Sequence, residues 1–307
     1  VNKVKTFCGQ EEQLARLRRY LLDEPGVAKR PLFVRGLSGM GKTSLLAQCV
    51  AMTTEQWCPP SEGVSVVFRY LGTSAMSYHI GDLLLSLLDQ LQLLYGLPVD
   101  EEATESSILL CRYFPQYLNS LCQGPLAPGS GRHLLLLLDS LDQLSPRDGA
   151  YSLAWLPRIC PPGIRLVFSS VPATEIRFPP DCELLELVAA MPRDTALAAL
   201  RKKLQRRNRR LQDSQERHLL DLFGMCPKPI YLKVLMREAL TWTSFTEPRL
   251  PVGQPGDDCV QVIKTEYHKT GNKILHSNPR YQRYGELFVR SALGPLTYLS
   301  QVGSGIS

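Results

Sequence analysis

The sequence lacks the residue patterns that mark several large classes of protein. Its nine cysteines are scattered, and none forms a C-x-x-C pair. This argues against a disulfide framework or a zinc site and favours a reducing compartment. The chain has no Asn-x-Ser/Thr acceptor for N-linked glycans, which is compatible with a cytoplasmic location. Its five histidines show no spacing suited to a metal ion, so we expect them to be structural or exposed.

Long apolar segments and a secretory signal are also lacking. The longest leucine run, Leu134–Leu138, is far too short to span a bilayer and predicts a buried strand. We therefore expect no membrane partner. No signal peptide opens the chain, which begins with Val1 rather than Met. We expect the sequence to be a piece of a longer protein.

Motifs of other enzyme classes are missing as well. The sequence has no G-x-S-x-G motif of a serine nucleophile. The residues around its cysteines also give no indication of a catalytic thiol. Asn272–Leu275 lacks the acid of the guanine-reading N-K-x-D motif, so a GTPase is not expected. With 307 residues, 44% of them hydrophobic and 21% charged, the chain has a globular composition. We expect one α/β domain and a second, smaller domain.

The net charge of +6 is modest and is concentrated in one basic run, 201–210. As a helix, this run places a leucine stripe toward the core: Leu197, Leu200, Leu204 and Leu211. RNA or acidic-lipid binding, nuclear localisation and phosphate contact are possible roles for its charges. We favour a solvated helix face, because no recognition helix, RNP motif or interleaved aromatics accompany the run. A nucleic-acid partner is not expected.

One motif is complete. Residues 36–43 read Gly36-Leu37-Ser38-Gly39-Met40-Gly41-Lys42-Thr43 and fit the phosphate-binding loop G-x-x-x-x-G-K-[ST]. A strand pattern at 31–35 enters the loop and a helix pattern at 44–52 leaves it. Glycines let successive backbone N–H groups face a phosphate, and the helix N-terminus adds partial positive charge. We expect the loop and Ser44 to bind the nucleotide, with Lys42 on the β- and γ-phosphates and Thr43 on Mg²⁺.

Strand and helix patterns alternate through the first two thirds of the chain. Further strands are predicted over 64–71, 133–139, 164–170 and 183–187, and helices over 7–23, 79–95 and 105–122. This alternation predicts an α/β fold, a P-loop NTPase with a mostly parallel five-stranded sheet flanked by helices. For Tyr70 and Trp155 we favour core packing over contact with a base.

The last third of the chain reads differently. Helices are predicted over 193–209, 214–224 and 229–243, and a Pro/Gly-rich linker follows at 247–258. We therefore expect a nucleotide-binding domain at 1–190 and a small helical domain at 191–245. Residues 246–307 form a linker and C-terminal segment of unknown type, in which 281–293 fits a helix and 302–307 a frayed end.

Two carboxylates follow the apolar strand at 133–138. Asp139 stands where the Walker-B arrangement places a residue that contacts Mg²⁺ through water, although a turn or N-cap residue fits this position too. Asp142 is the candidate to orient or deprotonate the attacking water. An ordinary solvated turn carboxylate is the alternative for Asp142.

These motifs carry a family resemblance. G-L-S-G-M-G-K-T-S and L-L-L-L-L-D-S-L-D-Q-L resemble the NACHT group of STAND signal-transduction NTPases, in particular the NACHT domains ahead of WD or tetratricopeptide repeats. Residues 7–11 resemble the F-x-G-R-E motif that lies beside the base in the family. Residues 168–172 resemble the end of the family's sensor strand, and residues 226–232 resemble the G-x-P-L-x-L motif that begins a helix. The resemblance covers residues 7–243 and implies that Pro229 packs near the adenine of ATP or ADP.

The chain departs from the family pattern at three positions. Gln143 stands where the last acid of D-G-x-D-E is expected, Val171 where many relatives carry an arginine, and Gln10 where the F-x-G-R-E arginine is usual. A neutral amide cannot serve as a general base, and a lost arginine removes a charge that stabilises the transferring phosphoryl group. We therefore expect ATP binding with slow hydrolysis.

The resulting hypothesis is a nucleotide-dependent conformational switch. ATP and ADP differ in the γ-phosphate and its Mg²⁺ contacts, a difference that can bias the helical domain. Output would pass to other proteins through segments outside this chain, or through a nucleotide-dependent homo-oligomer. A non-hydrolysing scaffold is the alternative that Gln143 and Val171 favour. A small-molecule kinase is a weaker one, because the arginine cluster lies beyond the fifth strand, where a kinase lid is not obvious.

Overall fold

The computed structural model describes residues 7–246, except 25, 59–62, 74–76, 173–174, 179–180 and 188–189. The chain divides into two compact units, Val1–Lys203 and Leu204–Ser307. The domain limits predicted at 190 and 245 stay predictions. The segments predicted at 247–258, 281–293 and 302–307 lie outside the described residues.

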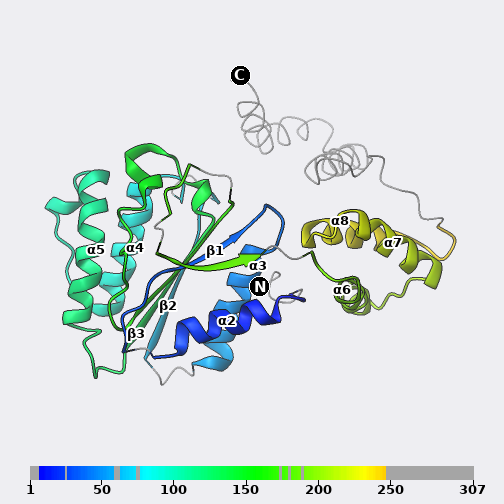
Figure 1. Ribbon diagram of the computed structural model, residues 1–307, viewed down its shortest axis with the longest axis horizontal. Coiled ribbons are helices and arrows are strands. Elements are labelled where there is room, and N and C mark those ends of the chain that lie inside the picture. Colours follow the sequence, from blue (N-terminus) through cyan, green and yellow to red (C-terminus); the bar gives the residue numbers. More distant parts are fainter. Residues whose placement is uncertain are drawn as a thin grey trace, which may run out of the picture. The chain divides into compact units, whose positions relative to one another are not determined.

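The first unit is built on a parallel sheet (Figure 1). Its described strands are β1 (Leu32–Gly36), β2 (Val64–Tyr70), β3 (His133–Asp139), β4 (Ile164–Ser170) and β5 (Glu183–Leu187). They lie in the order β2-β3-β4-β1-β5, and every pairing between neighbours is parallel. The α/β fold with five parallel strands is thus confirmed, and all carboxyl ends of the strands lie at one edge.

Helices cover both faces of this sheet. The helices α4 (Ile80–Tyr95) and α5 (Ser107–Gln123) pack on one face, and α2 (Glu11–Leu22) and α3 (Lys42–Met52) on the other. The leucines of β3 alternate between the two cores. Leu134, Leu136 and Leu138 join the α4–α5 core, whereas Leu135 and Leu137 join the α2–α3 core. A strand covered on both faces requires this continuous apolar run.

Several short elements were not predicted. A π-helix at Thr53–Trp57 prolongs α3, and a 3₁₀ helix, η5, forms at Leu141–Gln143. Single turns of this kind carry too few residues for a periodic pattern. The expectation of core packing is confirmed for Trp155, which is fully buried, and is wrong for Tyr70, which is 36% exposed. Tyr70 ends β2, an edge strand of the sheet.

The remaining described α-helices are α6 (Arg193–Gln205), α7 (Asp213–Met225) and α8 (Pro229–Ala239). Leu200 and Leu204 are buried as the leucine stripe predicted. However, α6 ends before the predicted limit of 209, because Asn208 takes a φ of 51°. The guanidinium of Arg209 donates to the carbonyls of Leu240 and Trp242. At least this member of the basic run therefore has a structural role within the second unit.

The described residues include eight cysteines and no candidate membrane-spanning helix. Among the described cysteines, Cys226 is disulfide-bonded and seven are not, namely Cys8, Cys49, Cys58, Cys111, Cys122, Cys160 and Cys182. Within the described part of the chain, no group of three or more His, Cys, Asp or Glu side chains is arranged to hold a metal ion. None of the described helices has the length and apolarity needed to cross a membrane.

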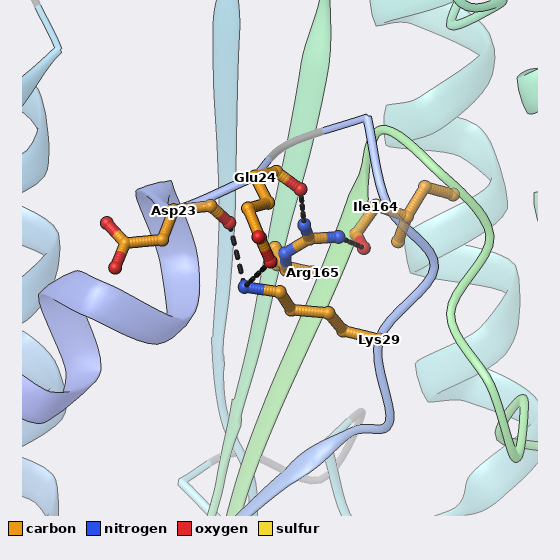
Figure 2. Close-up of polar contacts among 5 residues, drawn as sticks. All are labelled: Asp23, Glu24, Lys29, Ile164 and Arg165. Atoms are coloured by element: carbon orange, nitrogen blue, oxygen red, sulfur yellow. Dashed lines mark hydrogen bonds and ion pairs between the residues drawn. The ribbon is translucent and has the colours of Figure 1, made fainter.

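A buried arginine ties the loop after α2 to the sheet (Figure 2). Arg165, near the start of β4, is 2% exposed. Its Nη2 donates to the carbonyl of Glu24 at 2.6 Å and its Nη1 to that of Ile164 at 3.0 Å. Nearby, the Lys29 ammonium donates to the carbonyl of Asp23 at 2.8 Å. Burial lowers the pKa of Arg165, and Tyr20, Cys160 and Glu24 act in the opposite direction.

We expect Arg165→Ala to lower the free energy of unfolding by about 2–4 kcal/mol, because it leaves a cavity and two carbonyls without their donor. Lys29→Ala removes a partly exposed pair with Glu24 at 3.7 Å and should cost less than about 1 kcal/mol. Urea unfolding followed by tryptophan fluorescence measures both. Equal losses in the two variants would contradict the structural role of the guanidinium.

Candidate functional site

The phosphate loop joins β1 to α3 at the carboxyl edge of the sheet. Gly39 and Gly41 have φ values of 81° and 95°, a left-handed conformation that favours glycine. A Cβ on Gly36 would lie 2.9 Å from the Cβ of Leu187 in β5, so the close strand pairing also requires glycine there. The loop leads directly into the N-terminus of α3, where Gly41 is the N-cap. This is the backbone geometry of an anion site.

Lys42 lies within this loop. Its side chain is 8% exposed, and its Nζ donates to the carbonyls of Gly36 at 2.6 Å and Leu37 at 3.2 Å. Burial lowers the pKa of Lys42, while the negative charges of Asp142 and Asp139 counteract this effect. The ammonium and the two carboxylates predicted as site residues are therefore close enough to interact electrostatically.

Asp139 is the last residue of β3 and is 2% exposed. Its Oδ1 accepts a hydrogen bond of 2.6 Å from the hydroxyl of Ser169, near the end of β4. The same hydroxyl accepts from the backbone N–H of Ser140 at 2.9 Å. Ser169 thus fixes the orientation of the carboxylate. Sequence reasoning did not include Ser169 among the site residues, although it stands in the strand-end stretch 168–172.

Asp142 lies in the 3₁₀ helix η5, and both of its carboxylate oxygens accept hydrogen bonds. Oδ1 accepts from the backbone N–H of Val171 at 3.2 Å, and Oδ2 from Nε2 of Gln143 at 2.7 Å. Asp142 is therefore not a freely solvated turn residue. Two of the positions that depart from the family pattern, Gln143 and Val171, are its hydrogen-bond donors.

Gln10 reaches the phosphate loop from the start of α2. Its Nε2 donates to the carbonyl of Met40 at 2.8 Å, and the same nitrogen lies 3.3 Å from where a Cβ on Gly41 would be. The stretch 7–11 thus contacts the loop backbone. From the sequence, Gln10 was recognised only as a departure from the family pattern. A single glutamine gives no signal of a contact with a residue 30 positions away.

The other predicted site residues fall at several places. Thr43 and Ser44 are half-buried in the first turn of α3. Leu37 is 55% exposed, whereas the side chain of Met40 joins the α2–α3 core. Pro229 is the first residue of α8, in the second unit. Its contact with the adenine stays a prediction.

A cavity of about 620 Å³ lies elsewhere in the first unit. Trp57, Val64, Arg132 and His133 contribute to its lining. Val64 and His133 are the first residues of β2 and β3. The cavity therefore lies at the amino edge of the sheet, opposite the phosphate loop, and is no part of the site.

We expect the unsubstituted chain, without nucleotide, to gain stability relative to Lys42→Met as the pH rises toward the ordinary lysine pKa of 10.5. Because burial lowers the pKa of Lys42 in the folded chain, the unfolded chain binds more protons between the two pKa values, and stability rises with pH there. Urea unfolding at neutral and alkaline pH measures the difference. Lys202→Met, at an exposed position of α6, controls for the loss of a lysine. A difference independent of pH would contradict the burial of the ammonium.

Comparison with known proteins agrees with this geometry. No protein-family model matches the chain. NACHT domain- and WD repeat-containing protein 1 of Mus musculus is 28% identical over 277 residues, which cover 88% of this chain and 17% of that protein. NACHT and WD repeat domain-containing protein 2 of Mus musculus is 31% identical over 315 residues, which cover 96% of this chain and 16% of that protein. The chain thus spans about a sixth of these relatives.

A solved structure shares the fold. The Aeropyrum pernix ORC1 protein, determined in complex with DNA, aligns with a TM-score of 0.52 and 15% identity over 89% of this chain and 69% of that chain. The sequence relatives confirm the resemblance that the motifs indicated. The chain has the fold of a P-loop NTPase and is a homologue of the NACHT and WD repeat-containing proteins.

Proposed function

We propose that the chain binds ATP with Mg²⁺, hydrolyses it slowly and serves as a nucleotide-dependent conformational switch. The observation that carries this proposal is the buried Lys42 ammonium, held by the loop carbonyls and facing Asp139 and Asp142. Near-complete burial of an ammonium is costly without a strong partner. A triphosphate at the loop supplies that partner, because the ammonium can exchange the two carbonyls for phosphate oxygens.

The donor groups fit Mg²⁺. Thr43 offers a hydroxyl and Asp139 a carboxylate, and hard oxygen ligands are those that Mg²⁺ prefers beside nucleotide phosphates. Only Oδ1 of Asp139 takes part in the bond from Ser169. A ligand held in orientation by such a neighbour binds metal more firmly. When bound, the metal would neutralise charge on the β- and γ-phosphates.

Adenine is the proposed base. The guanine-reading motif is missing from the sequence, and the resemblance places Pro229 of the G-x-P-L-x-L-like stretch near an adenine. This assignment depends on the family resemblance, since Pro229 lies in the second unit.

Slow hydrolysis follows from the groups around the candidate base. Asp142 is occupied by two hydrogen-bond donors, and the residue after it is the amide Gln143. Val171 supplies no positive charge where many relatives have an arginine. Lys42 thus serves to bind ATP in its ground state, whereas the site has few groups that stabilise the transition state of hydrolysis specifically.

The switch would work through the γ-phosphate. Its presence or loss changes the contacts at Lys42 and the metal, and we propose that this biases the helical domain at 191–245. Output would reach other proteins through segments outside this chain or through nucleotide-dependent homo-oligomers. We place the protein in the cytoplasm because its cysteines are scattered and seven described ones form no disulfide, Cys226 being the exception.

Calorimetric titration with ATP tests the binding proposal. We expect Mg²⁺-dependent binding by the unsubstituted chain and a loss of about 10- to 100-fold in Lys42→Ala, because charge-assisted hydrogen bonds contribute about 1.5–3 kcal/mol. Asp139→Asn should remove most of the Mg²⁺ dependence. Lys202→Ala, at an exposed site on α6, is the matched control and should bind like the unsubstituted chain.

The outcomes separate the candidate functions. No affinity of the unsubstituted chain for any adenine nucleotide contradicts the switch and favours the scaffold. Turnover of several ATP per second contradicts slow hydrolysis, since typical enzymes work at about 10 s⁻¹. Consumption of ATP that requires a small-molecule acceptor instead of water points to a kinase.

A further inference from the structure

We propose that Gln143 is a positioning residue that restrains Asp142 and thereby slows hydrolysis. The group formed by Asp142, Gln143, Val171 and Gly72 is called the Asp142 clasp below. The inference rests on the proposed function, because it concerns the rate of the reaction proposed for this site. It assigns a physical role to the glutamine that stands where the family pattern has an acid.

The clasp joins three strand ends. Asp142 and Gln143 follow β3, Val171 follows β4 directly, and Gly72 follows β2. Each oxygen of the Asp142 carboxylate accepts one hydrogen bond, Oδ1 from the Val171 N–H at 3.2 Å and Oδ2 from the Gln143 amide at 2.7 Å. Two donors on opposite oxygens prevent the carboxylate from rotating freely. The hydroxyl of Tyr151 also donates to the Asp142 carbonyl at 3.2 Å and holds the backbone.

Gly72, just beyond the end of β2, holds Gln143 in place. It has a φ of 68°, and a Cβ added there would lie 2.6 Å from the Cβ and 3.2 Å from the Cγ of Gln143. Gln143 therefore packs directly on the backbone of Gly72. This contact fixes the Cβ and Cγ of Gln143 on the side of Gly72, and the exposed amide reaches Asp142 from there.

The chemistry predicts the direction of the effect. In hydrolysis, a water oxygen bonds to the γ-phosphorus, the bond from this phosphorus to the bridging oxygen breaks, and the water's proton passes to a base, giving ADP and inorganic phosphate. Each oxygen of the Asp142 carboxylate already accepts a hydrogen bond from a protein donor. The carboxylate is therefore held in one orientation and has fewer lone pairs left to accept a hydrogen bond from the attacking water. Removing one donor should speed the reaction.

The first variant is Gln143→Met, which keeps the length of the side chain and removes the donor. We expect the single-turnover rate of ATP hydrolysis at saturating ATP and Mg²⁺ to rise about tenfold, as the loss of one hydrogen bond to a charged group allows. The dissociation constant for ATP should change less than about twofold, because the clasp is not a phosphate ligand. Gln92→Met, on an exposed position of α4, is the matched control and should leave both values unchanged.

A double-mutant cycle shows whether the effect passes through Asp142. We expect Asp142→Asn to abolish the acceleration, so that Asp142→Asn with Gln143→Met hydrolyses no faster than Asp142→Asn alone. An acceleration that persists without the carboxylate would overturn the proposal. So would an unchanged or lower rate in Gln143→Met.

Gly72→Ala is an independent second variant. The added methyl group displaces Gln143 from Asp142, so hydrolysis should also accelerate, provided that circular dichroism shows a folded chain. If the rate of ATP hydrolysis is unchanged in both a folded Gly72→Ala and Gln143→Met, the Asp142 clasp is contradicted while the proposed function stands. Failure of the unsubstituted chain to bind ATP instead removes the proposed function itself, and the clasp with it.

Discussion

The candidate site depends on the placement of one ammonium group, that of Lys42, between the phosphate loop and two carboxylates. It is buried, it bonds to the carbonyls of Gly36 and Leu37, and Asp139 and Asp142 are its negative neighbours. Burial disfavours its charge, and the two carboxylates only partly compensate. A site with this balance gains from a highly charged anion, which is why a triphosphate is the ligand that we propose.

The sheet order makes this placement possible. Because β4 lies between β1 and β3, the loop after β1 and the carboxylate after β3 are separated by one strand end. Ser169 near that strand end bonds to Asp139, and Val171 just beyond it bonds to Asp142. The covered sheet, with one core on each face, fixes the strand ends on which these groups stand. Rigid elements position a site more precisely than loops do.

Much of this was predictable from the sequence, and the rest has identifiable causes. The five strands and the loop follow from apolar runs and glycine spacing, which are local signals. The contacts of Gln10 with Met40 and of Ser169 with Asp139 join residues far apart in the chain, and no periodicity encodes them. The early end of α6 was missed because its leucine stripe continues past the turn at Asn208. The exposure of Tyr70 depends on the position of β2 at the sheet edge.

The most direct test of the central claim is a crystal structure of the chain with Mg²⁺ and a non-hydrolysable ATP analogue. The account predicts that the Lys42 ammonium contacts the β- and γ-phosphates, and that the metal lies between the Thr43 hydroxyl and the side of the site where Asp139 stands. A triphosphate bound away from residues 36–44, or a metal far from both Thr43 and Asp139, would contradict it.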